Sequence, residues 1–177
     1  MALALVIAAL IGLPAAAQTK RKGPKTPRVL KVAKQQPFVA GGVRYAVQTI
    51  QSWQALPKVI GYEAPPPGST FVVVNYTAET LSSDPVIVDA NRFYLRDGKG
   101  RRFTVSDTAQ TTLAFAPVNP GNEVELRPQM VLQPGVRRLL LAGFIVPEET
   151  AALGFFLYFP TSGDFDFVEV WPSGEPH

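Results

Sequence analysis

The residues whose type and spacing could support catalysis in this chain are acidic. Glu123 and Glu125 are two positions apart, and residues at that spacing share one face of a β-strand. Two carboxylates held beside a groove are the machinery of glycoside hydrolysis. However, Pro120-Gly121 indicates a turn just before this pair, and acids close to turns are usually solvated surface groups. The sequence therefore favours a protein that is not an enzyme, with a secreted carboxylate-dependent hydrolase as the alternative.

Composition removes most other catalytic and metal-binding chemistries. The 177 residues include no cysteine, and the single histidine, His177, is the last residue. Thiolate nucleophiles, zinc sites of cysteine and histidine, and Ser-His-Asp arrangements therefore lack their essential residues. Asp97, in the sequence Asp97-Gly98-Lys99-Gly100, is a candidate calcium ligand, but the loop lacks the repeated acids and closing glutamate of an EF-hand. We expect no metal and no cofactor.

The N-terminus has the layout of a secretory signal peptide over residues 1–17. An apolar run from Ala2 to Leu13 is followed by Pro14 and three alanines, which predicts cleavage before Gln18. The run is shorter than the roughly 20 residues that span a bilayer. An uncleaved N-terminal anchor is the alternative, and the absence of cysteine excludes a lipid-anchored lipoprotein. We therefore expect a secreted or periplasmic protein.

A basic segment follows the predicted cleavage site. Residues 18–37 contain no acid and hold seven of the chain's 17 lysines and arginines: Lys20, Arg21, Lys22, Lys25, Arg28, Lys31 and Lys34. The remaining ten accompany all 14 acids, so the rest of the chain is mildly acidic. Three prolines in the segment predict a linker. Its charges could contact a polyanion such as lipid headgroups or cell-wall polymer; a plain solvated linker is the alternative. It lacks the interleaved aromatics of single-strand nucleic-acid binding, so we expect no specific nucleic-acid contact.

From Phe38 onward, short extended segments are separated by glycine and proline. Thr70–Glu79 is apolar on both faces at its start, which predicts a central strand. The Asp97-Gly98 step predicts a tight hairpin, and Glu148–Leu153 a single helical turn. About seven to nine short strands without a long helix predict an all-β, antiparallel β-sandwich as one domain over residues 38–177, with a closed barrel as the alternative.

Three segments, in order, resemble a known group of domains. They are Phe71-Val72-Val73-Val74-Asn75-Tyr76-Thr77, the run from Phe93 to Phe103, and Leu132-Gln133-Pro134-Gly135 leading into Ala142–Pro147. Over roughly residues 41–160 the chain resembles telokin-like, immunoglobulin-like bacterial exported domains of unknown function, a group related to a mycobacterial immunoprotective extracellular antigen. The resemblance implies an immunoglobulin-like sandwich and carries over no catalytic residue. The chain departs from lipid-anchored members by its missing cysteine, and it extends further at its C-terminus.

Contact with a partner is the function that these observations favour. Trp53 lies near a predicted strand end, beside the proline-rich stretch from Ala64 to Gly68, and is the candidate aromatic for ligand contact. The phenylalanines between Phe155 and Phe159 suit the core. We expect an exported, non-enzymatic, immunoglobulin-like domain with a binding or adaptor role at the cell envelope. Its partner would be an unknown protein or envelope polymer, and a structural envelope component is a further alternative.

Overall fold

The computed structural model describes residues 26–57, 62–115, 124–125, 129–153, 155–160 and 167–171. The predicted signal peptide and the first part of the basic segment, with Lys20, Arg21, Lys22 and Lys25, lie outside these residues. Across the described ranges, no helix combines the length and the apolar character needed to cross a membrane.

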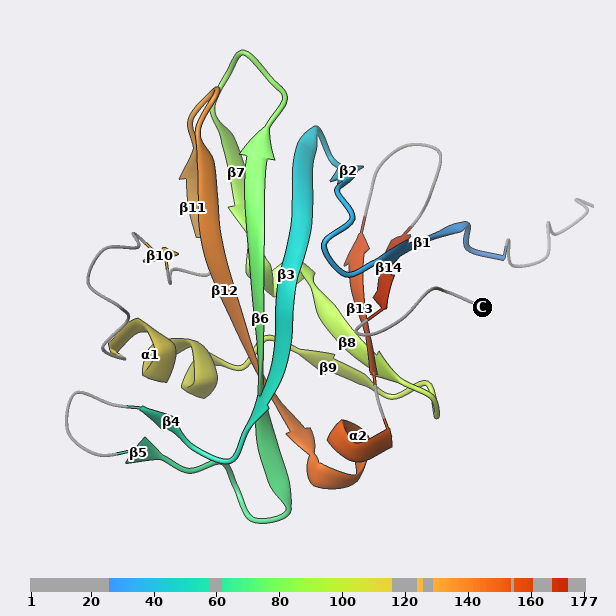
Figure 1. The fold of residues 1–177 in the computed structure, drawn as a ribbon, viewed down its shortest axis with the longest axis vertical. Helices are drawn as coiled ribbons and strands as arrows, with labels where there is room; N and C mark the ends of the chain where they lie inside the picture. Colours follow the sequence, from blue (N-terminus) through green and yellow to red (C-terminus); the bar gives the residue numbers. More distant parts are fainter. Residues whose placement is uncertain are drawn as a thin grey trace, which may run out of the picture.

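The first layer is a five-stranded sheet built around one long strand, β6 (Ser69–Thr80). β6 pairs antiparallel along most of its length with β12 (Arg137–Pro147) and with β3 (Val43–Trp53). The short strands β2 (Phe38–Ala40) and β10 (Val124–Glu125) complete the order β10-β12-β6-β3-β2. The prediction that Thr70–Glu79 is central is therefore confirmed (Figure 1).

The second layer faces the inner side of that sheet. It contains another five-stranded sheet, in the order β1-β14-β13-β8-β9, and a two-stranded ribbon of β7 and β11 (Figure 1). These elements are β1 (Val29–Ala33), β7 (Val86–Asp89), β8 (Tyr94–Asp97), β9 (Arg102–Thr104), β11 (Gln129–Leu132), β13 (Phe155–Pro160) and β14 (Phe167–Trp171). A small hairpin of β4 (Leu56–Pro57) and β5 (Tyr62–Glu63) lies outside both layers. The predicted all-β sandwich is confirmed, although β1–β14 and β10–β12 pair in parallel.

The core explains why β6 is apolar on both faces. On its inner face, Val72, Val74, Tyr76 and Ala78 are buried between the two layers. Five aromatic rings meet there, from Phe38, Tyr45, Tyr76, Phe93 and Phe159; the centroids of Phe93 and Phe159 are 4.2 Å apart. On the outer face, Phe71 and Val73 are buried in a second apolar cluster. Helix α1 (Asp107–Phe115) covers that cluster with Ala109 and Leu113.

Helix α1 also protects the far edge of β12. The side-chain amide of Gln110 donates to the Leu141 carbonyl at 3.1 Å, and its Oε1 accepts the Gly143 N–H at 3.1 Å. These bonds replace the contacts of a neighbouring strand. Gly143 permits the approach, because a Cβ at this position would lie 2.8 Å from the Cβ of Ala109. The predicted helical turn at 148–153 is present as α2 (Glu148–Leu153).

The predicted hairpin at Asp97-Gly98 is confirmed with one correction. Strands β8 and β9 pair antiparallel from Tyr94–Thr104 to Arg96–Arg102. The positive φ of the loop, 83°, belongs to Gly100 and not to Gly98. The Gly100 N–H donates to the Asp97 carbonyl at 2.9 Å. This is the three-residue hairpin loop in which a turn is followed by a left-handed glycine.

The predicted linker over residues 18–37 is wrong in its second half. Val29–Ala33 forms β1, which pairs in parallel with the last strand, β14. Val32 is only 2% exposed, whereas Lys31 is exposed. The apolar residues between the lysines therefore belong to the core, and Pro27 and Pro37 lie just outside the strand, where they do not interrupt its pairing.

We predict that Gln110→Met destabilises the protein by about 1–3 kcal/mol, because it leaves the Leu141 carbonyl and the Gly143 N–H without partners in a buried place. Urea unfolding followed by circular dichroism measures the change. Thr111→Met, at the exposed next position of the same helix, is the matched control and should change stability by no more than about 0.5 kcal/mol. Equal stability of the two variants would contradict the edge-capping role of Gln110.

Candidate binding pocket

The structure places three of the seven predicted basic contacts at the edge of the sandwich. Arg28 precedes β1, and its carbonyl accepts the Phe167 N–H at 3.3 Å. Lys31 lies within β1 opposite Glu169 of β14, and Lys34 follows the strand in an exposed position. These three positions are fixed by the sheet, so they present charge on the domain itself.

Trp53 lies at the last position of β3, paired in register with Phe71, and is 40% exposed. Its carbonyl accepts the Thr70 hydroxyl at 2.9 Å, which holds the strand end in place. Gln51 and Ser52 beside it are also exposed. The indole is therefore accessible, and it lines a shallow hollow together with Gln51 and Ser52.

The acidic candidates do not form a site among the described side chains. Glu123 lies outside the described residues, and only the backbone of Glu125, in β10, is described. Asp97 has both carboxylate oxygens engaged. Its Oδ1 accepts the N–H groups of Lys99 (3.0 Å) and Arg101 (2.8 Å), and its Oδ2 accepts Arg101 Nε at 2.7 Å. No group of three or more histidines or acids suited to a metal occurs in the described ranges.

Asp97 instead stabilises the β8–β9 turn and connects it to α2. Arg101 donates onward to Glu149 Oε1 and to Thr150 Oγ1, both at 2.8 Å. Burial raises the pKa of the Asp97 carboxyl, but the hydrogen bonds and the charge of Arg101 outweigh it, so the net pKa lies below its ordinary value. The ionised Asp97 carboxylate therefore stabilises the folded protein fully above the pKa that Asp97 has in the unfolded chain. This stabilisation is lost as the pH falls through the lower pKa that Asp97 has in the folded protein.

We predict that Asp97→Asn lowers the melting temperature at pH 7 and that its deficit relative to the native protein narrows below about pH 4, where the unfolded aspartate becomes protonated. Thermal unfolding followed from pH 7 to pH 2 measures this. Asp84→Asn removes an exposed acid for which no partner is recorded in the described part of the chain, and should leave the melting curve nearly unchanged. A pH-independent deficit in the Asp97 variant would contradict the assignment.

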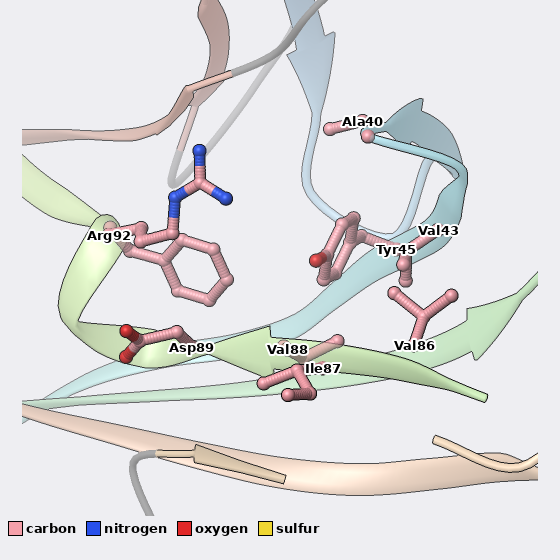
Figure 2. A pocket seen from close by; sticks show the side chains of 10 residues that line it. Ala40, Val43, Tyr45, Val86, Ile87, Val88, Asp89 and Arg92 are labelled. Carbon is pink, nitrogen blue, oxygen red and sulfur yellow. The ribbon is translucent and has the colours of Figure 1, made fainter. Parts of the chain in front are cut away.

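A pocket with two side-chain donors, Tyr45 and Arg92, lies at the opposite end of β3 from Trp53. Its volume is about 80 Å³, and it lies between the β2–β3 hairpin and the segment from β7 to the 3₁₀ turn η1 (Ala90–Arg92). Gly41 and Gly42, with φ of 58° and 76°, form the tight turn that joins β2 to β3. Tyr45 and Arg92 project into the hollow from these two sides (Figure 2).

Tyr45 is held rigidly beneath the pocket. It is 6% exposed, and its ring packs edge-to-face on Phe93 with 5.8 Å between centroids. No hydrogen-bond partner of its hydroxyl occurs among the residues that the structure describes. Burial raises the pKa of Tyr45 to about 12, although the charge of Arg92 opposes the shift. The hydroxyl therefore stays protonated at neutral pH and is a permanent donor.

The charged groups of the pocket differ in how far they are satisfied. Asp89 Oδ1 accepts the Asn91 N–H at 2.9 Å and its Oδ2 accepts Gln129 Nε2 at 3.1 Å. Arg92, by contrast, is exposed and has no ion pair within the described ranges. Apolar side chains, including Val43, Val86 and Val88, supply the rest of the lining. The arrangement can bind a small group with polar acceptors, and it holds no nucleophile–base pair.

A second hollow, of about 190 Å³, lies on the outer side of the first sheet between Pro37 and Thr77. Its two arginines, Arg44 and Arg137, both contact Glu79 Oε2, at 3.3 and 3.4 Å. Because these charges are already paired, this hollow offers less unsatisfied chemistry than the pocket beside Tyr45.

Sequence reasoning missed the Tyr45–Arg92 pocket. Val43, Tyr45 and Val47 alternate with more polar residues, which indicates that Tyr45 faces the core. A tyrosine in such a row usually needs a partner for its hydroxyl, and this was the available signal. The position of Arg92 follows only from the topology, which brings η1 against the start of β3.

No family model and no curated protein matches the sequence. Two solved structures share the architecture. A conserved hypothetical protein from Bacillus anthracis is 15% identical with a TM-score of 0.53, over 71% of this chain and 86% of its own. An uncharacterized β-sandwich protein from Clostridium difficile 630 is 10% identical with a TM-score of 0.54, over 86% and 99%. These likenesses show the β-sandwich fold alone.

Proposed function

We propose that this protein is an exported, non-enzymatic binding domain that acts by contact at the cell envelope, and that its sandwich belongs with the telokin-like, immunoglobulin-like domains of unknown function. The export signal predicted at residues 1–17 supports the location. The absence of cysteine and of any internal histidine supports a role without covalent or metal chemistry. The β-sandwich shared with uncharacterized bacterial proteins is compatible with both.

One observation supports contact more directly than any other. On the β7–β11 ribbon, Ile87 and Val131 are paired directly across the strands, and they are 68% and 52% exposed. The opposite face of the ribbon carries Val88 and Leu132, which are 3% and 0% exposed. The ribbon is therefore apolar on both faces although only one is covered. An exposed apolar pair of this kind is typical of an interaction surface.

The basic residues would add a second, weaker attraction. Lys31 and Lys34 are exposed at the β1 edge, and further cations precede them in the sequence. Attraction between exposed charges and an anionic envelope is screened within about 10 Å at 0.1 M salt. Salt should therefore weaken the initial approach more than the apolar contact itself.

We predict that the full-length protein, and a form that begins at Gln18, both co-sediment with envelope fractions of the host. The double variant Ile87→Ser with Val131→Ser should reduce the retained fraction by about tenfold or more. The reason is that burying two branched side chains contributes about 3–6 kcal/mol in total. Ultracentrifugation with quantitative immunoblotting measures retention, and circular dichroism checks the fold.

The matched control is Val39→Ser with Leu81→Ser, two exposed apolar residues (52% and 48%) outside the ribbon, and it should bind like the native protein. Failure of the native protein to co-sediment would overturn the proposal. Equal retention of the ribbon variant and the control would refute the assigned surface. Glycan hydrolysis that disappears in Glu123→Gln with Glu125→Gln would favour the hydrolase instead.

A further inference from the structure

We propose that the pocket between the β2–β3 hairpin and η1 binds a carboxylate group carried on a short apolar substituent. The Tyr45 hydroxyl and the Arg92 guanidinium are the donors, and the pocket's valines hold the substituent. This inference rests on the proposed function and deepens it by naming a ligand class. The pocket borders the proposed contact surface, because Ile87 lines the pocket and is also one of the two exposed residues of the ribbon.

The first step is the state of the Tyr45 hydroxyl. The ring is fixed by four aromatic neighbours, of which Phe38 stacks at 5.7 Å and Phe159 lies at 5.2 Å between centroids. The packing therefore restricts the positions that the hydroxyl can take. Figure 2 shows the hydroxyl oxygen directed across the hollow toward the side on which Arg92 lies. The hydroxyl at the pocket wall can donate a hydrogen bond to an acceptor that enters the pocket.

The second step is the pairing of that hydroxyl with Arg92. A guanidinium has donors in a planar fork that matches the two oxygens of a carboxylate. Both side chains line the same pocket, and the charge of Arg92 opposes the rise that burial gives to the pKa of the Tyr45 hydroxyl. Asp89 lies in the same pocket, and the hydrogen bonds that its two oxygens accept come from Asn91 and Gln129.

The third step is the choice of a monoanion. Asp89 leaves the pocket with one positive and one negative group, so a dianion such as phosphate would meet repulsion that a carboxylate meets to a smaller degree. The volume of about 80 Å³ admits only a few heavy atoms. The walls formed by Val43, Val86 and Val88 favour an apolar substituent. A longer substituent would leave the pocket over the exposed side chain of Ile87.

Two sources carry this chemistry: a free short-chain acid, and the C-terminal carboxylate of a peptide that ends in a small apolar residue. The test titrates the purified full-length protein with isobutyrate and with Gly-Gly-Val, following amide chemical shifts by NMR. Isobutyramide, C-terminally amidated Gly-Gly-Val and inorganic phosphate are the ligand controls. We expect saturable shifts at the start of β3 and in η1 for the two carboxylates, and at least tenfold weaker binding of the three controls.

Two variants test the donors. Tyr45→Phe removes the hydroxyl and keeps the ring packing, and Arg92→Gln removes the charge; each should weaken carboxylate binding by about tenfold or more. Arg137→Gln, which alters a surface arginine that contacts Glu79 outside the pocket, should bind normally. Tighter binding of the peptide than of isobutyrate would assign the site to a peptide terminus, and equal binding would assign it to a free acid.

The proposal is overturned if neither carboxylate binds, if the amides bind as well as the acids, or if Tyr45→Phe binds like the native protein with an unchanged spectrum elsewhere. These outcomes are separate from envelope co-sedimentation, since the titration uses no envelope. Carboxylate binding without co-sedimentation would refute the proposed function and leave the pocket assignment standing. Co-sedimentation without carboxylate binding would refute the pocket assignment and leave the proposed function standing.

Discussion

The structure depends on one constraint: β6 must be buried on both faces at once. A strand in an antiparallel sheet can leave one face in water, but the apolar residues of β6 alternate to both sides. The inner side requires the second layer of strands, and the outer side requires α1. Both apolar clusters formed by the described residues are therefore organised around a single strand. The sequence of that strand therefore explains why helix α1 packs on the outer face of the first sheet.

The same constraint prepares the pocket. Tyr76 on β6 and Tyr45 on β3 belong to the aromatic group that joins the layers, with 6.3 Å between their centroids. The closed packing of that group gives the Tyr45 ring one position. At the end of the sandwich the two layers are less completely filled, because the β2–β3 turn consists of two glycines without side chains. A rigid hydroxyl at the floor of a partly open end is the result, and rigid donors are what a small-ligand site requires.

Features that depend on neighbouring residues could be predicted from the sequence, and features that depend on distant residues could not. The central strand, the Asp97 hairpin and the turn at Glu148 each have a local pattern of alternation, glycine or capping. Helix α1 lacks such a pattern, because threonines and Gln110 occupy much of it. Ala109 and Leu113 are the residues that it contributes to the buried apolar cluster. β1 was placed inside a predicted linker because lysines and prolines surround it in the sequence. Exposure of Trp53 follows from its strand-end position, whereas the meeting of Tyr45 with Arg92 requires the topology.

The parallel pairing of β1 with β14 has a consequence for biosynthesis. Among the described strands β1 is made first and β14 last, so β1 waits for its neighbour until the strands between them have been made. Contacts between residues so distant in sequence slow folding, since the loop must close before the contact forms. A chain that cannot complete its second layer early stays open during synthesis. The pairing of β1 with β14 is therefore the step that closes this edge of the second sheet after the other described strands have been made.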